Sequence, residues 1–114
     1  MQSFKGTQTL MRIFIGESDK HHHQPLYQVL VDLFREEKLA GCTVLRGIMG
    51  FGAKAHLHSA NILRLSQDLP MVIEVVDRRE NIDRILPKID EIMPEGMITL
   101  ENVEVIRYAP KENS

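Results

Sequence analysis

The sequence predicts an α+β fold of the ferredoxin-like type, an antiparallel four-stranded sheet with two helices on one face. Apolar residues alternate with period two in four segments and recur at helical spacing in two others, and these segments follow the order βαββαβ. This order is the split βαβ motif, whose right-handed crossovers place both helices on the same side of the sheet. With 114 residues, 43% apolar and 26% charged, the chain is long enough for one domain spanning residues 1–114.

Local signals define the first three elements. Residues Leu10 to Ile15 alternate in hydrophobicity and predict a strand. A broad apolar stripe from Leu26 to Leu39 predicts a buried helix, with Pro25 in its first turn and Gly41 as its stop signal. The run from Thr43 to Ile48 is rich in β-branched residues and ends at a glycine, which predicts a second strand.

The next two elements repeat the pattern. Residues Met71 to Val76 follow a proline and predict a third strand. Asp77 and Glu80 then have the spacing of a capping box, and the apolar residues that follow keep helical spacing. We expect Pro87 to kink this second helix.

Gly96 interrupts the helical pattern, and the alternation from Met97 to Tyr108 predicts the last strand. We expect a bulge near Asn102, where the alternation weakens. Residues 109–114 form a short polar tail.

The face of the sheet opposite the helices has no cover from the chain itself. If the strands lie in the order fourth, first, third, second, Arg12 falls between Glu74 and Glu104, and Arg46 lies near Glu74. The same face then carries a mostly apolar surface of Phe14, Val44, Ile48, Val72, Val76 and Ile106. A patch of this size predicts self-association. A register slip of one residue would instead scatter these side chains over both faces.

Composition excludes several classes of protein. No apolar run reaches the ~20 residues of a membrane span, and no signal peptide is evident, so we expect a cytoplasmic protein. The net charge of -2 argues against a general nucleic-acid binder. The single cysteine, Cys42, opens an apolar strand and is expected to be a small buried hydrophobe.

The connection between the second and third strands, residues 47–69, is unusually long, and such connections are usually functional or disordered. Its first part reads RGIMGFG, in which Gly47, Gly50 and Gly52 allow positive φ and close approach to a ligand around Phe51. Arg46 and Lys54 add positive charge, which suits a phosphate. Plain turn glycines would explain the same pattern.

Later in the connection, Arg64 is a candidate anion contact and Asp68 a candidate turn residue before Pro70. His56 and His58 have the spacing that places both rings on one side of an extended segment, where they are candidate zinc or copper ligands or solvated loop residues. The run His21 to His23 lies in a polar stretch before the first helix and can chelate metal adventitiously.

The sequence contains no nucleophile elbow, HExxH or CxxC motif. The best enzyme interpretation would use His56 or His58 as a general base. A binding protein with no required cofactor is therefore favoured.

Three segments, LRGIMGFG, LSQDLPMVIEVVD and GESDK before PLYQVLV, resemble the family called domain of unknown function 190, in the PII-like signalling superfamily. The resemblance covers roughly Leu10 to Tyr108. It implies a trimer of ferredoxin-like subunits with the sheets packed inward, nucleotides in clefts between subunits, and a mobile T-loop corresponding to Gly47–Leu69.

The resemblance also implies roles for single residues. The turn Pro94-Glu95-Gly96 looks like a shortened PII phosphate loop, and Val103 to Tyr108 resembles the PII ending whose arginine contacts phosphate, a role that falls to Arg107. The phosphate turn is reduced to one glycine, and the tyrosine-bearing loop tip that some PII proteins modify is missing, so regulation by uridylylation is not supported.

The resulting hypothesis is a non-catalytic trimeric sensor that binds AMP, ADP or ATP between subunits and signals to a transporter or enzyme through the loop. Its charged contacts would come from Arg46, Lys54, Arg64 and Arg107. Two alternatives are a metal-binding tolerance protein that uses the histidines and a nucleotide hydrolase.

Overall fold

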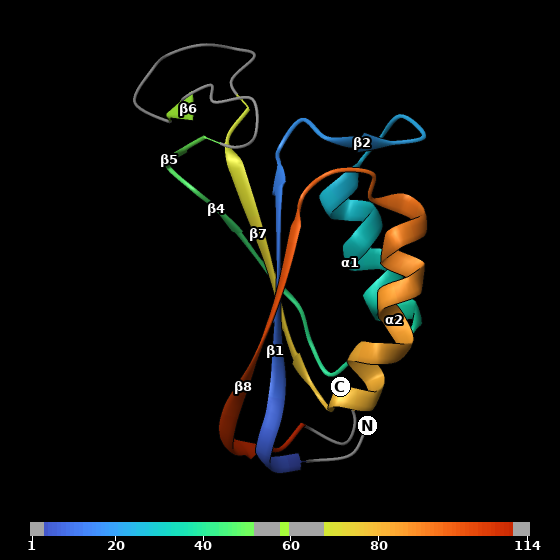
Figure 1. Cartoon of the computed structure of the whole chain (residues 1–114), viewed down its shortest axis with the longest axis vertical. Helices are drawn as coiled ribbons and strands as arrows, with labels where there is room; N and C mark the ends of the chain where they lie inside the picture. The colour runs from blue at the N-terminus through green and yellow to red at the C-terminus, as the bar shows by residue number, and fades with distance from the viewer. Residues whose placement is uncertain (1–3, 52–57, 60–67, 111–114) are drawn as a thin grey trace.

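The computed structural model describes residues 4–51, 58–59 and 68–110. Its main sheet is antiparallel with the order β4-β7-β1-β8, and α1 and α2 lie side by side on one face (Figure 1). The elements are β1 (Phe4–Gly16), α1 (Leu26–Glu36), β4 (Thr43–Arg46), β7 (Pro70–Asp77), α2 (Arg79–Ile92) and β8 (Met97–Tyr108). The predicted fold class and strand order are confirmed.

Short strand pairs occupy two of the connections. Before α1, β2 (Lys20–His21) pairs with β3 (Gln24–Pro25). After β4, β5 (Met49–Gly50) pairs with β6 (His58–Ser59). In the described part of the chain, no helix is long and apolar enough to cross a membrane.

The core lies between the sheet and the helices. Alternate residues of β1 and β7, such as Ile13 and Ile73, are fully buried beneath α1 and α2. Leu30 and Phe34 of α1 and Ile85 of α2 meet them from above, each at most 1% exposed. Burying a large aliphatic side chain stabilises the fold by about 1.5–3 kcal/mol, so this layer holds the single chain together.

The helix α1 ends at Glu36, three residues before Leu39, which the sequence predicted as its last residue. Lys38 adopts a left-handed conformation with φ 61° and directs its N–H to Arg35 O, while Leu39 N–H bonds to Phe34 O. These two bonds form a Schellman motif, a helix ending in which glycine usually takes the position of Lys38. The tertiary contacts of the buried Phe34 and Leu39 therefore outweigh the local preference for glycine.

The capping box predicted for α2 is wrong. The helix has Arg78 as its N-cap, without a capping side chain. The carboxylate of Asp77, 2% exposed, accepts hydrogen bonds from the backbone N–H of Ala40 and of Arg78 and from the Asn81 amide, at 2.7–2.8 Å. Asp77 therefore joins the segment after α1 to the start of α2, which continues through Pro87 to Ile92.

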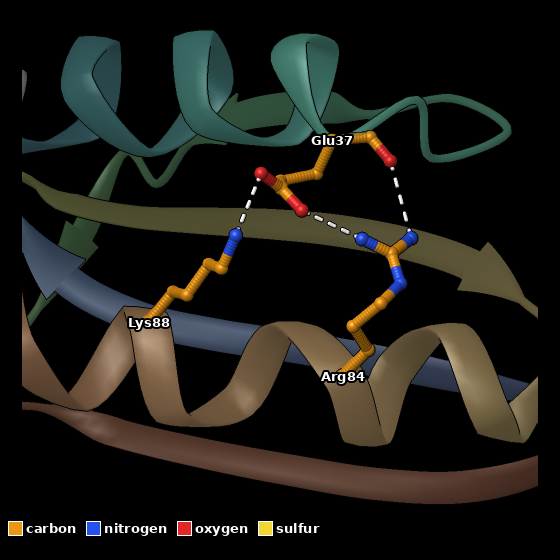
Figure 2. Close-up of polar contacts among 3 residues, drawn as sticks. All are labelled: Glu37, Arg84 and Lys88. Carbon is orange, nitrogen blue, oxygen red and sulfur yellow. Dashed lines mark hydrogen bonds and ion pairs between the residues drawn. The ribbon is translucent and has the colours of Figure 1, made fainter.

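A cluster of three charged residues joins the end of α1 to α2 (Figure 2). Glu37 accepts hydrogen bonds from Arg84 at 2.6 Å and from Lys88 at 2.8 Å, and its backbone carbonyl accepts a second bond from Arg84. The hydrogen bond from Lys88, with the positive charges of both partners, lowers the pKa of Glu37. The cluster aligns the two helices over the sheet.

The bulge in the last strand is not at Asn102, which pairs regularly with Thr9. The register shifts between the pairs Gly6↔Val105 and Phe4↔Tyr108, so that two residues of β8 face one of β1. Beyond the bulge, the rings of Phe4 and Tyr108 stack at 4.7 Å, and the Tyr108 hydroxyl donates to Ala40 O at 2.8 Å.

On the uncovered face, Arg12 bonds to Glu74 at 2.9 Å, as predicted, and to Glu101. The prediction of Glu104 is wrong, because the register places Glu104 opposite Thr7, further along the sheet. Phe14, Val72 and Val76 share this face, since they pair across β1 and β7 in register with Arg12 and Glu74.

Of the other residues predicted on that face, Val44 and Arg46 are wrong. Val44 pairs with Ile73 and packs on the core, and Arg46 pairs with Met71, so both lie on the helix side, while Leu45 takes the uncovered face. Ile48 lies beyond the end of β4, and Ile106 lies in the bulge of β8. The face of β4 slipped by one residue in the prediction, which turns every side chain of a strand over.

Candidate functional site

The candidate site lies at one end of the sheet, here called the glycine end. There β1 ends at Gly16 opposite Pro70, β4 ends at Arg46 opposite Met71, and β8 begins at Met97 opposite Phe14. The connection between β4 and β7 leaves the sheet at this end (Figure 1). Functional residues predicted near either end of that connection therefore gather here.

Gly47 and Gly50 both pack against the ring of Pro70. A Cβ atom would lie 2.7 Å from Pro70 Cγ at Gly47 and 3.0 Å from it at Gly50. Gly47 also donates its N–H to Pro70 O at 2.7 Å. The sequence indicated that these glycines allow positive φ or close approach to a ligand. Neither has positive φ, and both allow close approach between the backbone and the proline ring, which positions the base of the connection.

Arg46 meets an acidic partner that the sequence analysis missed. Its guanidinium lies 3.0 Å from the carboxylate of Glu17, and 60% of the Arg46 side chain is exposed. Glu17 is held in place because its N–H bonds to Leu69 O at 2.8 Å. The sequence signals for Glu17 were its position close to the end of the first strand and its place in the segment GESDK. A surface pair of this kind is worth about 0–1 kcal/mol, so Glu17 holds Arg46 only weakly.

Asp68 fastens the end of the connection to the segment after β1. Its carboxylate accepts the N–H of Ser18 at 2.8 Å, and a Cβ at Gly16 would lie 2.7 Å from it. Gly16 N–H bonds in turn to the Asp19 carboxylate at 2.9 Å. The predicted turn role of Asp68 thus extends to a contact across the glycine end.

Gly96 also lies at the glycine end, immediately before β8. Its φ is 125°, and a Cβ there would lie 2.9 Å from Phe14 O and 3.0 Å from the end of Met93. Only glycine fits this backbone without strain. The turn that the resemblance likens to a phosphate loop is therefore at the same end as Arg46 and Gly47.

Phe51, at the limit of the described segment, is 72% exposed. Its neighbours Ile48 and Met49 are 74% and 53% exposed. Three exposed large apolar side chains at the base of the connection form a surface that suits contact with a ligand base or another protein.

Arg107 lies at the opposite end of the sheet. It is exposed in the bulge of β8, next to the residue that pairs with Phe4, whereas β8 begins at the glycine end. Ten residues of extended strand separate Met97 from Arg107, which corresponds to ~33 Å. Arg46 and Arg107 of one chain therefore cannot bind the same phosphate.

Several predicted site residues lie outside the described part of the chain: Gly52, Lys54, His56 and Arg64. For His58 the structure gives only the backbone, which pairs with Gly50. Across residues 4–51, 58–59 and 68–110, no group of three or more potential ligands is arranged for a metal ion.

The histidine run forms the tip of the β2–β3 hairpin. His22 and His23 both have positive φ, at 50° and 69°, and the rings of His21 and His22 lie 4.1 Å apart. Cys42 is half-buried, and burial raises the pKa of its thiol. This agrees with its expected role as a small apolar residue, because a raised pKa disfavours the reactive thiolate.

The fold is that of the PII-like proteins. A structure of CPII, a nitrogen regulatory PII-like protein from Thiomonas intermedia K12 bound to ADP, AMP and bicarbonate, has a TM-score of 0.64 at 12% identity, covering 92% of this chain and 99% of that one. A second structure of CPII, bound to ADP and bicarbonate, has a TM-score of 0.55 at 14% identity and covers 91% of both chains.

Within that fold class, the chain belongs to the DUF190 family (Uncharacterized ACR, COG1993), whose model matches residues 8–105. A UPF0166 protein of Aquifex aeolicus is 38% identical over 97 residues, covering 85% of this chain and 91% of the relative. The UPF0166 protein MJ1524 of Methanocaldococcus jannaschii is 34% identical over 99 residues, covering 86% and 91%. The resemblance inferred from the sequence is confirmed.

Proposed function

We propose that this protein is a trimeric PII-like sensor that binds an adenine nucleotide in clefts between its subunits. The observation that carries the proposal is the position of Arg46 at the glycine end, exposed beside the close-packed Gly47 and Gly50. The proposal is supported by the two solved CPII structures, which share the fold: one is bound to ADP and AMP, and the other to ADP.

The distance between the two arginines supports a site between subunits, given the role that the family resemblance implies for Arg107. Arg46 and Arg107 are at opposite ends of one sheet, so both reach one nucleotide only when Arg107 comes from a neighbouring subunit. The uncovered face supplies a surface for such an assembly, because Phe14, Val72 and Leu45 lie on it without cover from the chain's helices. A self-complementary apolar face of this kind is typical of a homo-oligomer.

Exchange of partners at Arg46 provides the mechanism of response. In the structure, Glu17 neutralises Arg46 and is joined through its own N–H to Leu69, at the far end of the connection. A nucleotide phosphate would take the guanidinium from Glu17 with a charge-assisted bond, typically worth about 1.5–3 kcal/mol. We propose that this exchange changes the conformation of residues 47–69, and that a transporter or enzyme partner binds the changed segment.

The test is a thermal-shift titration with AMP, ADP and ATP on the wild type, Arg46→Gln and Arg107→Gln. Arg35→Gln is the matched control, because Arg35 is an exposed arginine in the last turn of α1. We expect a nucleotide to raise the Tm of the wild type and of the control but not of the two site variants. Glu17→Gln should bind several-fold more tightly, since it removes the competing carboxylate.

Two outcomes would refute the proposal. In one, no adenine nucleotide stabilises the wild type; in the other, Arg107→Gln retains the full shift. Chromatography of the nucleotide after prolonged incubation separates the sensor from a hydrolase, because a sensor returns its ligand unchanged. A wild type that runs as a monomer in analytical ultracentrifugation would remove the inter-subunit cleft.

A further inference from the structure

A cavity of about 340 Å³ lies at the end of the sheet opposite the glycine end. It opens between the first half of β1, the facing part of β8 and the start of α2. Its lining is polar throughout: Thr7, Gln8, Thr9, Arg78, Arg79, Glu80 and Asn102. None of these residues belongs to the site proposed above, so the cavity needs its own explanation.

The start of α2 presents unused hydrogen-bond donors to this cavity. The N-cap Arg78 provides no capping side chain, and its own N–H is taken by Asp77. The N–H groups of Asn81 and Ile82 reach Arg78 O, but those of Arg79 and Glu80 have no acceptor among the residues that the structure describes. Free N–H groups and the helix dipole together favour a negatively charged ligand at this position.

Thr9 gives an independent indication of a ligand. It is 2% exposed and lines the cavity from β1, in register with Asn102 and with Asp77. Its hydroxyl has no hydrogen-bond partner within residues 4–51, 58–59 and 68–110. Buried hydroxyl groups are almost always hydrogen-bonded to protein, to ordered water or to a ligand, so this one calls for a water molecule or a ligand in the cavity.

Charge favours an oxyanion as that partner. Two arginines line the cavity, and Arg79 is anchored at its edge by Asp83 at 2.8 Å. The nearby carboxylate of Asp77 already accepts three hydrogen bonds, which leaves Glu80 as the acidic group of the lining. Donors from the helix, from Thr9 and from the Asn102 amide can therefore meet on one acceptor-rich group.

We propose that this cavity is a second ligand site, which binds a phosphate group through the N–H groups of Arg79 and Glu80 and the hydroxyl of Thr9. The phosphate is either inorganic phosphate or part of a small metabolite. The site shares no residue with the proposed nucleotide cleft, and within one chain it lies at the end of the sheet opposite Arg46.

The test is a ¹H–¹⁵N NMR titration with inorganic phosphate at constant ionic strength, with glycerol 3-phosphate as a second arm. Saturable shifts of the Thr9, Arg79 and Glu80 amides are expected, with chloride giving none. If glycerol 3-phosphate binds more tightly than inorganic phosphate, the ligand is a metabolite phosphate. If it binds equally or more weakly, the ligand is inorganic phosphate.

Thr9→Val should weaken binding about tenfold, because it removes one hydrogen bond to a charged acceptor and keeps the shape of the side chain. The same variant should be at least as stable as the wild type in urea without phosphate, since it buries no unpaired hydroxyl. Arg79→Gln should also weaken binding, whereas Arg35→Gln removes an equal charge at a distance and should not.

Three results would overturn the proposal. The shifts could occur only around Arg46, Gly47 and Arg107 and not at Thr9, Arg79 and Glu80, which is the response expected of the nucleotide site alone. Thr9→Val could leave phosphate affinity unchanged, which would show that water satisfies the hydroxyl. Equal losses in Arg79→Gln and Arg35→Gln would reduce the effect to general electrostatic attraction.

Discussion

The two faces of the main sheet use alternate residues of the same strands in different ways. On the covered face, Ile13 and Ile73 are completely buried beneath the helices. On the uncovered face, Phe14 and Val72 remain half-buried beside Arg12, whose guanidinium already bonds to two carboxylates. The first face holds one chain together, and the second retains apolar area that neither α1 nor α2 covers (Figure 1).

On the uncovered face, Arg12 and the carboxylates of Glu74 and Glu101 form a cluster of charged residues. The hydrogen bond to Glu74 raises the pKa of Arg12, so this charge persists at any ordinary pH. Covering a charge is tolerable only when its partners are already in place. Arg12 meets that condition within one chain, which favours a face that can be buried in an assembly.

The largest expected effect is on the covered face. Ile73→Ala should lower the free energy of unfolding by about 2–5 kcal/mol, because a fully buried side chain is removed from a close-packed layer. Val72→Ala, one residue along the same strand, is the matched control and should cost much less in the isolated chain. Urea unfolding measures both, and equal losses would contradict the difference between the faces.

The uncovered face should respond through assembly. Phe14→Glu places a carboxylate among Val72 and the other apolar side chains of this face, and it should weaken association of the proposed trimer about a hundredfold or more. Sedimentation velocity measures the change, and circular dichroism should show a folded chain. A variant that stays trimeric would show that the subunits meet through another surface.

Much of the fold could be predicted from the sequence because the spacing of the apolar residues and the positions of glycine and proline indicate the same elements along most of the chain. The bounds of β8 were predicted to the residue, and β7 to within one residue at each end. The face of β4 was wrong because its run TVLR is short and apolar on both sides. Without a clear alternation, only the pairing of Leu45 with Val72 decides which side chains face the helices.

The candidate site was less predictable because its contacts join distant segments. Nothing near Arg46 in the sequence indicates that Glu17 is its partner, and nothing near Gly47 indicates that Pro70 fills the space a side chain would need. The sequence indicated positive φ or close approach to a ligand as the role of the glycines. Among the candidate glycines that the structure describes, positive φ holds only for Gly96, and the close approach at Gly47 and Gly50 is to Pro70. These contacts depend on tertiary packing, which the local sequence pattern does not reveal.

The helix layer on the covered face contains a strained backbone position, Lys38. Lys38 has φ 61° at the end of α1, where glycine carries no steric cost. Lys38→Gly should raise the free energy of unfolding by about 0.5–1 kcal/mol, net of the greater freedom of glycine in the unfolded chain. Lys38→Ala is the control, since it keeps the Cβ atom and should give no gain. Destabilisation by Lys38→Gly in urea would show that the lysine side chain contributes to packing.

The smallest effect concerns the pH dependence of the contact between the helices. Lys88 and Arg84 lower the pKa of Glu37 below its usual value, so the stability that this carboxylate contributes is present above the unfolded pKa near 4.5 and is lost as pH falls through the lower folded value. The effect should be small because the partners are exposed. Urea unfolding at pH 7 and at steps below 4.5 should show a smaller acid-dependent loss in Glu37→Gln than in the wild type. Identical pH profiles would show that the cluster aligns the helices without contributing measurable stability. Apolar burial on the covered face would then be the source of the difference in stability between the two faces.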